Sequence, residues 1–171
     1  IARHLSDCEP FGLLDPGALI YRETLLAVGG YRRQFRLGSY ADLWARIAEH
    51  GHRFVVHHEP VVKYRMHASS IVASAGTACP LMTRWIGECM RARRERRPEP
   101  TWDEFLALWN RKPFWTRWRE LRAQYAHVYF RNAGLAWGER IPVEFLRNLS
   151  AAFVLRPIHT MRRLLAQILG R

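Results

Sequence analysis

Long apolar runs are absent from this chain of 171 residues. Arginine interrupts every candidate, including the segment from Val143 to Leu169, before it reaches the roughly 20 apolar residues that a membrane-spanning helix needs. We therefore expect a chain that is soluble or attached to a membrane surface.

Cysteine is scarce as well. The three cysteines, Cys8, Cys79 and Cys89, are odd in number and show no CxxC or CxxH spacing, which indicates neither a disulfide framework nor a zinc site. This usage fits a reducing cytoplasm, and no charged segment followed by an apolar run indicates a secretory signal. The sequence opens with Ile1 rather than Met, so we interpret it as a fragment of a longer protein.

Acidic residues and lysines are also few. The sequence has 15 Asp and Glu against 27 Lys and Arg, of which only Lys63 and Lys112 are lysines. The net charge of +12 would attract phosphate groups on nucleic acid, anionic lipid or a nucleotide-sugar. Hydrophobic residues make up 49% of the chain, which excludes a disordered protein.

The first 74 residues alternate between short apolar segments and short helical patterns. The predicted helices are Glu23–Val28, stopped by Gly29-Gly30, and Ala41–His50, stopped by Gly51. The predicted strands are Ala18–Tyr21, Phe54–Val56 and Val61–Tyr64. This alternation predicts an α/β layer over residues 1–74.

After about Ser74 every segment has helical periodicity, which predicts an α-helical subdomain over residues 80–171. Thr101 and Glu104 form a capping box, and Pro142 and Pro157 introduce the last two helices. The predicted helices are Pro80–Arg94, Thr101–Trp109, Phe114–Trp137, Val143–Leu155 and Ile158–Leu169.

Four short motifs follow one another within residues 17–71 at characteristic separations. They are Gly17-Ala-Leu-Ile-Tyr-Arg22, Val28-Gly-Gly-Tyr31, Asp42-Leu-Trp-Ala-Arg46 and Tyr64-Arg-Met-His67. In this order they resemble the family 2, inverting glycosyltransferases of the GT-A type. The resemblance implies a partial GT-A layer, with a divalent metal (Mg or Mn) bridging the diphosphate of the sugar donor. It also places the metal-binding DxD motif before Ile1, because no DxD occurs in this sequence.

The resemblance further implies a carboxylate base at the start of the helix that carries Asp42. In the family this base belongs to a Glu-Asp pair, and ungapped spacing puts that pair on Ser39 and Tyr40 here. Tyrosine is a poor base at neutral pH because its pKa is near 10. The candidate catalytic residues are therefore Asp42 and Tyr40, with a structural role for Asp42 at the helix amino terminus as the alternative.

Three further residues are candidate binding groups under the same resemblance. His67 would contact the metal or the donor diphosphate, or else only end a strand. Arg65 would pair with a phosphate or with a helix acid, since a guanidinium suits both. Gly17 would let the backbone approach a substrate, or else meet the needs of a turn.

The resulting hypothesis is a glycosyltransferase fragment that acts with a nucleotide-sugar donor and a cell-surface or lipid-linked glycan acceptor. Without DxD and the Glu-Asp pair we expect it to be inactive alone, and whether it is an enzyme is left open. We expect a cytoplasmic location, with an anionic membrane surface as a further partner. The alternative is a noncatalytic helical module that binds a partner, a membrane or nucleic acid through its basic surface, although no specific nucleic-acid motif is present.

Overall fold

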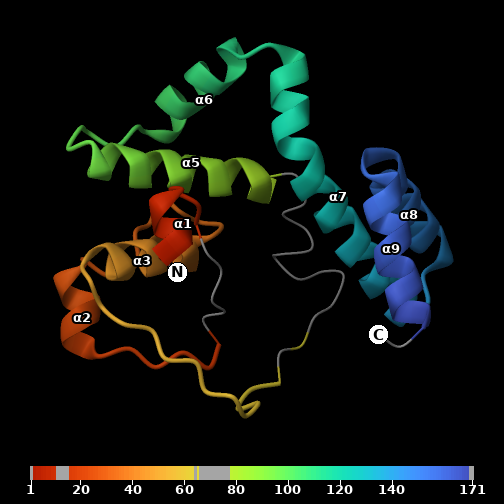
Figure 1. Ribbon diagram of the computed structural model, residues 1–171, viewed down its shortest axis with the longest axis horizontal. Helices are drawn as coiled ribbons and strands as arrows, with labels where there is room; N and C mark the ends of the chain where they lie inside the picture. Colours follow the sequence, from red (N-terminus) through yellow and green to blue (C-terminus); the bar gives the residue numbers. More distant parts are fainter. Residues whose placement is uncertain (1, 11–15, 64, 66–77, 170–171) are drawn as a thin grey trace. The chain divides into compact units, whose positions relative to one another are not determined.

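A computed structural model describes residues 2–10, 16–63, 65 and 78–169, and the regular structure within them is entirely helical (Figure 1). The helices are α1 (Ala2–Ser6), α2 (Arg22–Ala27), α3 (Ser39–Glu49), α5 (Ala78–Arg94), α6 (Trp102–Arg111), α7 (Phe114–Gly138), α8 (Pro142–Leu155) and α9 (Pro157–Ile168). They fall into two compact units. The first comprises residues up to Arg65 with Leu81–Ala107, and the second contains the chain from Leu108 on.

Glycines follow the ends of α2 and α3, as the sequence predicts. Gly29 and Gly30 follow α2 with φ angles of 78° and 64°, and Gly51 follows α3 with a φ of 80°. A residue with a Cβ is disfavoured at these angles, so glycine lets the chain turn away from the helix axis.

The core of the first unit has one part built on α3. Leu43, Trp44 and Ile47 are buried at helical spacing and pack with Val28. The ring of Phe54 meets the ring of Trp44 edge-on, with centroids 5.8 Å apart. Each such side chain contributes about 1.5–3 kcal/mol when it leaves water, so this apolar face fixes the orientation of α3.

A second part of this core lies between α5 and the start of α6. The ring of Trp85 on α5 lies tilted against the ring of Phe35, at a centroid distance of 4.5 Å, and edge-on to the ring of Trp102, at 5.3 Å. Its indole nitrogen donates a 2.8 Å hydrogen bond to the carbonyl of Pro100. The predicted capping box is confirmed, because the Thr101 amide donates to the Glu104 carboxylate at 2.8 Å and the Glu104 amide donates to the Thr101 hydroxyl at 3.3 Å.

The predicted α/β layer is wrong for the described residues, where no strand forms. Residues 18–21, 54–56 and 61–62 are apolar but run as irregular chain. Leu19 and Val55 are almost completely exposed, at 101% and 94%. A strand requires a neighbour that completes its hydrogen-bond ladder, and none of these segments has one within the described part of the chain.

The second unit is a set of three packed helices in which α8 contacts both α7 and α9. Small buried residues, Ala133 and Ala136 on α7 and Ala152 on α8, allow these helices to approach closely. The hydroxyl of Thr160 on α9 donates a 2.9 Å hydrogen bond to the carbonyl of Ala152. Pro142 and Pro157 occupy the first turns of α8 and α9, as the sequence predicts.

Within the described residues, none of the helices combines the length and the apolar character that crossing a bilayer requires.

Candidate functional site

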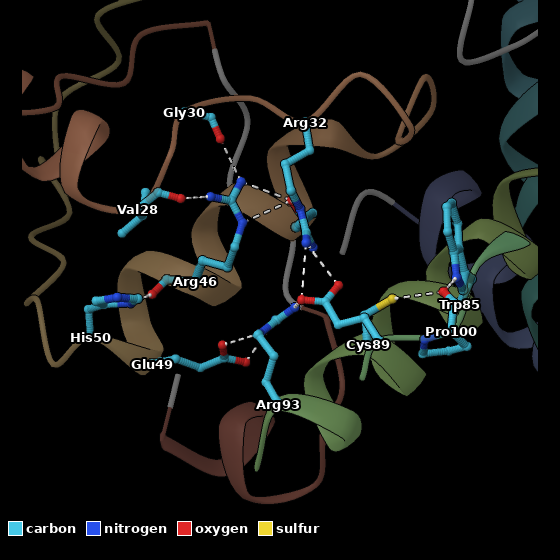
Figure 2. A network of polar contacts seen from close by, with 12 residues as sticks. Val28, Gly30, Arg32, Arg46, Glu49, His50, Trp85, Cys89, Arg93 and Pro100 are labelled. Carbon is cyan, nitrogen blue, oxygen red and sulfur yellow. Dashed lines mark hydrogen bonds and ion pairs between the residues drawn. The ribbon is translucent and has the colours of Figure 1, made fainter. Parts of the chain in front are cut away.

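One face of α3 carries three charged side chains, Asp42, Arg46 and Glu49, at positions i, i+4 and i+7. They join charged groups from three other segments of the first unit to form what we call the ion-pair network (Figure 2). In order of contact its members are Arg46, Asp42, Arg32, Glu99, Arg93 and Glu49. The signs alternate along this order, so the three positive and three negative charges balance.

Asp42 is the most deeply buried member of the network. Its side chain has no exposed surface, yet it lies between the guanidinium groups of Arg32 and Arg46. The Oδ2 atom accepts hydrogen bonds from Arg32 Nε at 3.0 Å and from Arg46 Nη2 at 2.9 Å, while Oδ1 accepts from Arg32 Nη2. Both oxygens are therefore occupied by cationic donors.

Arg46 connects α3 to the turn that follows α2. Besides bonding Asp42, its Nη2 donates a 2.6 Å hydrogen bond to the carbonyl of Gly30, and its Nη1 donates to the carbonyl of Val28. One guanidinium thus satisfies two backbone acceptors at the glycine turn (Figure 2). Two of the motifs that carry the sequence resemblance, residues 28–31 and 42–46, are in direct contact through this side chain.

Glu99 and Arg93 extend the network to α5. Arg32 Nη1 donates to both Glu99 oxygens, at 3.0 and 2.8 Å, and Arg93 Nη1 donates to Glu99 Oε1 at 3.0 Å. Arg93 also forms a two-pronged pair with Glu49, at 2.6 and 3.0 Å. Burial opposes the charged form of Glu99, but hydrogen bonds and attraction from Arg93 and Arg32 outweigh it and hold the pKa of the carboxyl below its usual value.

The same surroundings act on the buried thiol of Cys89, which lies beside the network on α5 (Figure 2). Burial, together with the negative charge and hydrogen bonding of Glu99, raises the pKa of Cys89 to about 12. The thiol therefore stays protonated at neutral pH and is a poor nucleophile.

Both predicted catalytic residues, Asp42 and Tyr40, lie within the described part of the chain. A general base must reach the proton that it removes, within about 2.6–3.2 Å. Asp42 is enclosed by two arginines, a position that favours its structural role over proton transfer. Tyr40 is half-buried on the first turn of α3 and packs against the apolar cluster around Leu43. Their catalytic assignment stays a prediction.

The two predicted substrate-binding residues lie on neighbouring exposed segments. Gly17 has a φ of 89°, and a Cβ placed on it would come within 2.8 Å of a Val62 methyl carbon. This close approach gives a structural reason for glycine there. Arg65 is exposed and follows Val62 by three residues, so their Cα atoms are at most about 11 Å apart.

The predicted metal ligand, His67, lies outside the described residues. Within the described ranges no three His, Cys, Asp or Glu side chains gather as a metal site. Asp42, in the motif of residues 42–46, is already held by two arginines and does not fit a metal-binding role. We therefore derive no step that passes through a metal.

Of the six members of the network, sequence reasoning singled out only Asp42 as a site residue. Arg46 was noted only as part of a motif, and the other four were missed, namely Arg32, Glu49, Arg93 and Glu99. Arg93 belongs to the basic run from Arg91 to Arg97, which has the pattern of a solvated helix end. In the structure its side chain is only 21% exposed. The available signal was the spacing of Asp42, Arg46 and Glu49, since three charges on one face of a largely apolar helix require partners.

Comparison of this chain with protein-family models, with curated proteins and with solved structures gives no significant match.

Proposed function

We propose that the chain is a noncatalytic segment of an inverting glycosyltransferase, and that it performs no sugar transfer by itself. The whole enzyme would move a sugar from a nucleotide-sugar to a cell-surface or lipid-linked glycan. The proposal rests on the four ordered motifs in residues 17–71 and on their resemblance to the family 2 glycosyltransferases.

The observation that carries the proposal is the contact made by Arg46. This arginine holds Asp42 of its own motif and the carbonyls of Val28 and Gly30 in the glycine motif. Asp42 and Arg46 therefore share one structural role, which is to fix the glycine turn against α3.

The geometry also limits what the chain contributes to the chemistry. Inverting transfer requires a carboxylate that takes the proton of the acceptor hydroxyl as it attacks the anomeric carbon. Because Asp42 is buried between two guanidinium groups, we infer that another residue of the whole enzyme takes this proton. The described residues would supply the scaffold, and the exposed guanidinium of Arg65 would supply a phosphate contact.

The proposal is tested by the coding sequence upstream of Ile1 and by the activity of the protein that it encodes. We expect an in-frame segment with a DxD motif. The longer protein should release nucleoside diphosphate from a UDP-, GDP- or TDP-sugar in the presence of manganese, whereas the 171-residue chain should not.

The contribution of Arg65 is tested in the same assay. Arg65→Ala should raise the KM for the donor, and the matched variant Arg36→Ala, at an exposed arginine of the same unit, should leave it unchanged. An upstream frame without DxD, or a longer protein that neither hydrolyses nor transfers the sugar, contradicts the proposal.

A further inference from the structure

Helix α9 of the second unit has its polar and apolar faces in an unusual arrangement. Polar groups contribute to its contacts with the rest of the unit, because the Thr160 hydroxyl bonds the Ala152 carbonyl on α8 and Arg163 contacts α7, while Leu164 is half-buried. The Arg163 guanidinium lies 2.8 Å from His127 Nδ1 and 4.9 Å from the centre of the Phe130 ring. The polar groups of α9 therefore hold it to the rest of the unit.

The outward side of α9 is apolar and exposed. Ile158, Met161, Leu165 and Leu169 follow one another at intervals of three and four residues, which places them on one stripe. Their exposed fractions are 71%, 43%, 47% and 70%. We call these four residues, together with Arg162 between them, the outer face of α9. A helix of a water-soluble domain normally has the opposite arrangement.

The charge around this face has one sign. Arg162 lies within the stripe and Arg156 directly precedes the helix, and both are exposed. No Asp or Glu occurs anywhere from Phe145 to the last residue. Apolar side chains with arginines among them suit an interface that is apolar within and anionic at its edge, because arginine can keep its guanidinium at the polar level while its stem is buried.

We propose that the outer face of α9 binds the surface of an anionic lipid bilayer, with the helix lying parallel to the membrane. The 12 residues of α9 span about 18 Å, too short for the roughly 30 Å hydrocarbon layer, so the helix would lie in the headgroup region. This inference does not depend on the proposed transferase function.

The test is co-sedimentation of the 171-residue chain with phosphatidylcholine vesicles that contain or lack phosphatidylglycerol, at low and at high salt. We expect binding to the anionic vesicles, weakened by salt, and little binding to the neutral ones. The double variant Ile158→Gln/Leu165→Gln should lower the partition coefficient by at least about tenfold. Arg162→Gln should lower it by about fivefold, which corresponds to about 1 kcal/mol per cation near an anionic surface.

Matched controls come from the first unit. Leu19→Gln/Val55→Gln removes two apolar side chains that are even more exposed than Ile158 and Leu165, and Arg36→Gln removes an exposed arginine, so neither should change binding. Glutamine is a good helix former, and circular dichroism should show unchanged helicity for the α9 variants. Hydrogen exchange provides a second measurement, because the amides of Ile158–Leu169 should exchange more slowly when anionic vesicles are present.

Three results would overturn the inference. In the first, the α9 and control variants lose binding equally or not at all. In the second, the amides of α9 exchange at the same rate with and without vesicles. In the third, sedimentation equilibrium shows a dimer that the α9 double variant dissociates, which would identify a second copy of the chain as the occupant of this face.

Discussion

Arg32 donates hydrogen bonds to both carboxylate oxygens of Asp42 from a loop ten residues earlier in the chain. Arg46 approaches the same carboxylate from the next turn of α3. An acid that the sequence offers as a catalytic base is thereby the anchor on which a loop, a glycine turn and a helix converge. Replacing Asp42 should therefore first change the stability of the first unit, because its hydrogen-bond partners, Arg32 and Arg46, both hold segments of that unit together.

We predict that Asp42→Asn lowers the free energy of unfolding by about 3–5 kcal/mol, since it leaves two guanidinium groups without their shared counter-charge in a buried site. Asparagine can accept only through its carbonyl, and its amide would face cationic donors. Urea unfolding followed by circular dichroism measures the change.

The control for Asp42 is Asp103→Asn, which removes an exposed acid from the first turn of α6. There only the interaction with the helix dipole is lost, and we expect about 0.3–1 kcal/mol. Equal effects at the two positions would show that burial between arginines adds nothing to the role of Asp42.

Glu99 should make the first unit sensitive to acid. Because its folded-state pKa is depressed, the unfolded chain takes up a proton at higher pH than the folded chain does. The stabilisation is complete above the ordinary glutamate pKa of about 4.3, and it is lost as the pH falls from there through the folded-state value.

The variant Glu99→Gln should therefore be less stable than the wild type near neutrality. Its stability should also fall less steeply than that of the wild type below about pH 5. Urea midpoints across the acid range provide the measurement, with Glu23→Gln on the exposed side of α2 as the control. If wild type and Glu99→Gln lose stability in parallel as the pH falls, the coupling of Glu99 to Arg93 and Arg32 is not present.

Cys89 should report the opening of the same region. Its side chain has no exposed surface, and its pKa of about 12 leaves almost no thiolate at neutral pH. We expect iodoacetamide to modify it only when the first unit opens, and about a hundredfold or more faster in Asp42→Asn if the stability loss is 3–5 kcal/mol. Mass spectrometry of the peptide that contains Cys89 measures the rate. Fast labelling of the native wild type would contradict the buried position.

Seven of the eight helices in the described residues were predictable from the sequence because their signals are local, whereas α1 was missed. Thr101 and Glu104 are three residues apart and cap α6 by themselves, and the glycines after α2 and α3 set the φ angles at which those helices stop. Such patterns require no knowledge of distant segments. The boundaries accordingly agree to within about two residues, the precision with which helix ends are defined.

The absence of strands from the described residues was not predictable on the same basis. An apolar run such as Phe54–Val56 has the composition of a strand, but a strand exists only where another segment pairs with it. The ion-pair network shows the same limit, since Arg32 and Glu99 are 67 residues apart and each alone has the pattern of a surface charge. Both features depend on distant partners that local periodicity does not reveal.

The second unit should respond to pH through His127 on α7. Arg163 has no acceptor atom, so the 2.8 Å contact between its guanidinium and His127 Nδ1 requires an unprotonated Nδ1, with the imidazole proton on Nε2. Burial and the positive charges of Arg163, His159 and Arg131 lower the pKa of His127 below its ordinary value of 6.5. The unfolded chain therefore binds the proton at higher pH, and stability should fall as the pH drops from about 6.5 through the folded-state pKa.

His127→Gln provides the test, because a glutamine carbonyl can still accept from Arg163 but does not titrate. The variant should retain most of the stability of the wild type at neutral pH. Just below about pH 6.5 its stability should fall less than that of the wild type. Urea unfolding at closely spaced pH values measures this, and His57→Gln, at an exposed histidine of the first unit, serves as the control. If protonation instead stabilised the wild type in this range, His127 would be charged in the folded protein, and the hydrogen bond from Arg163 could not form.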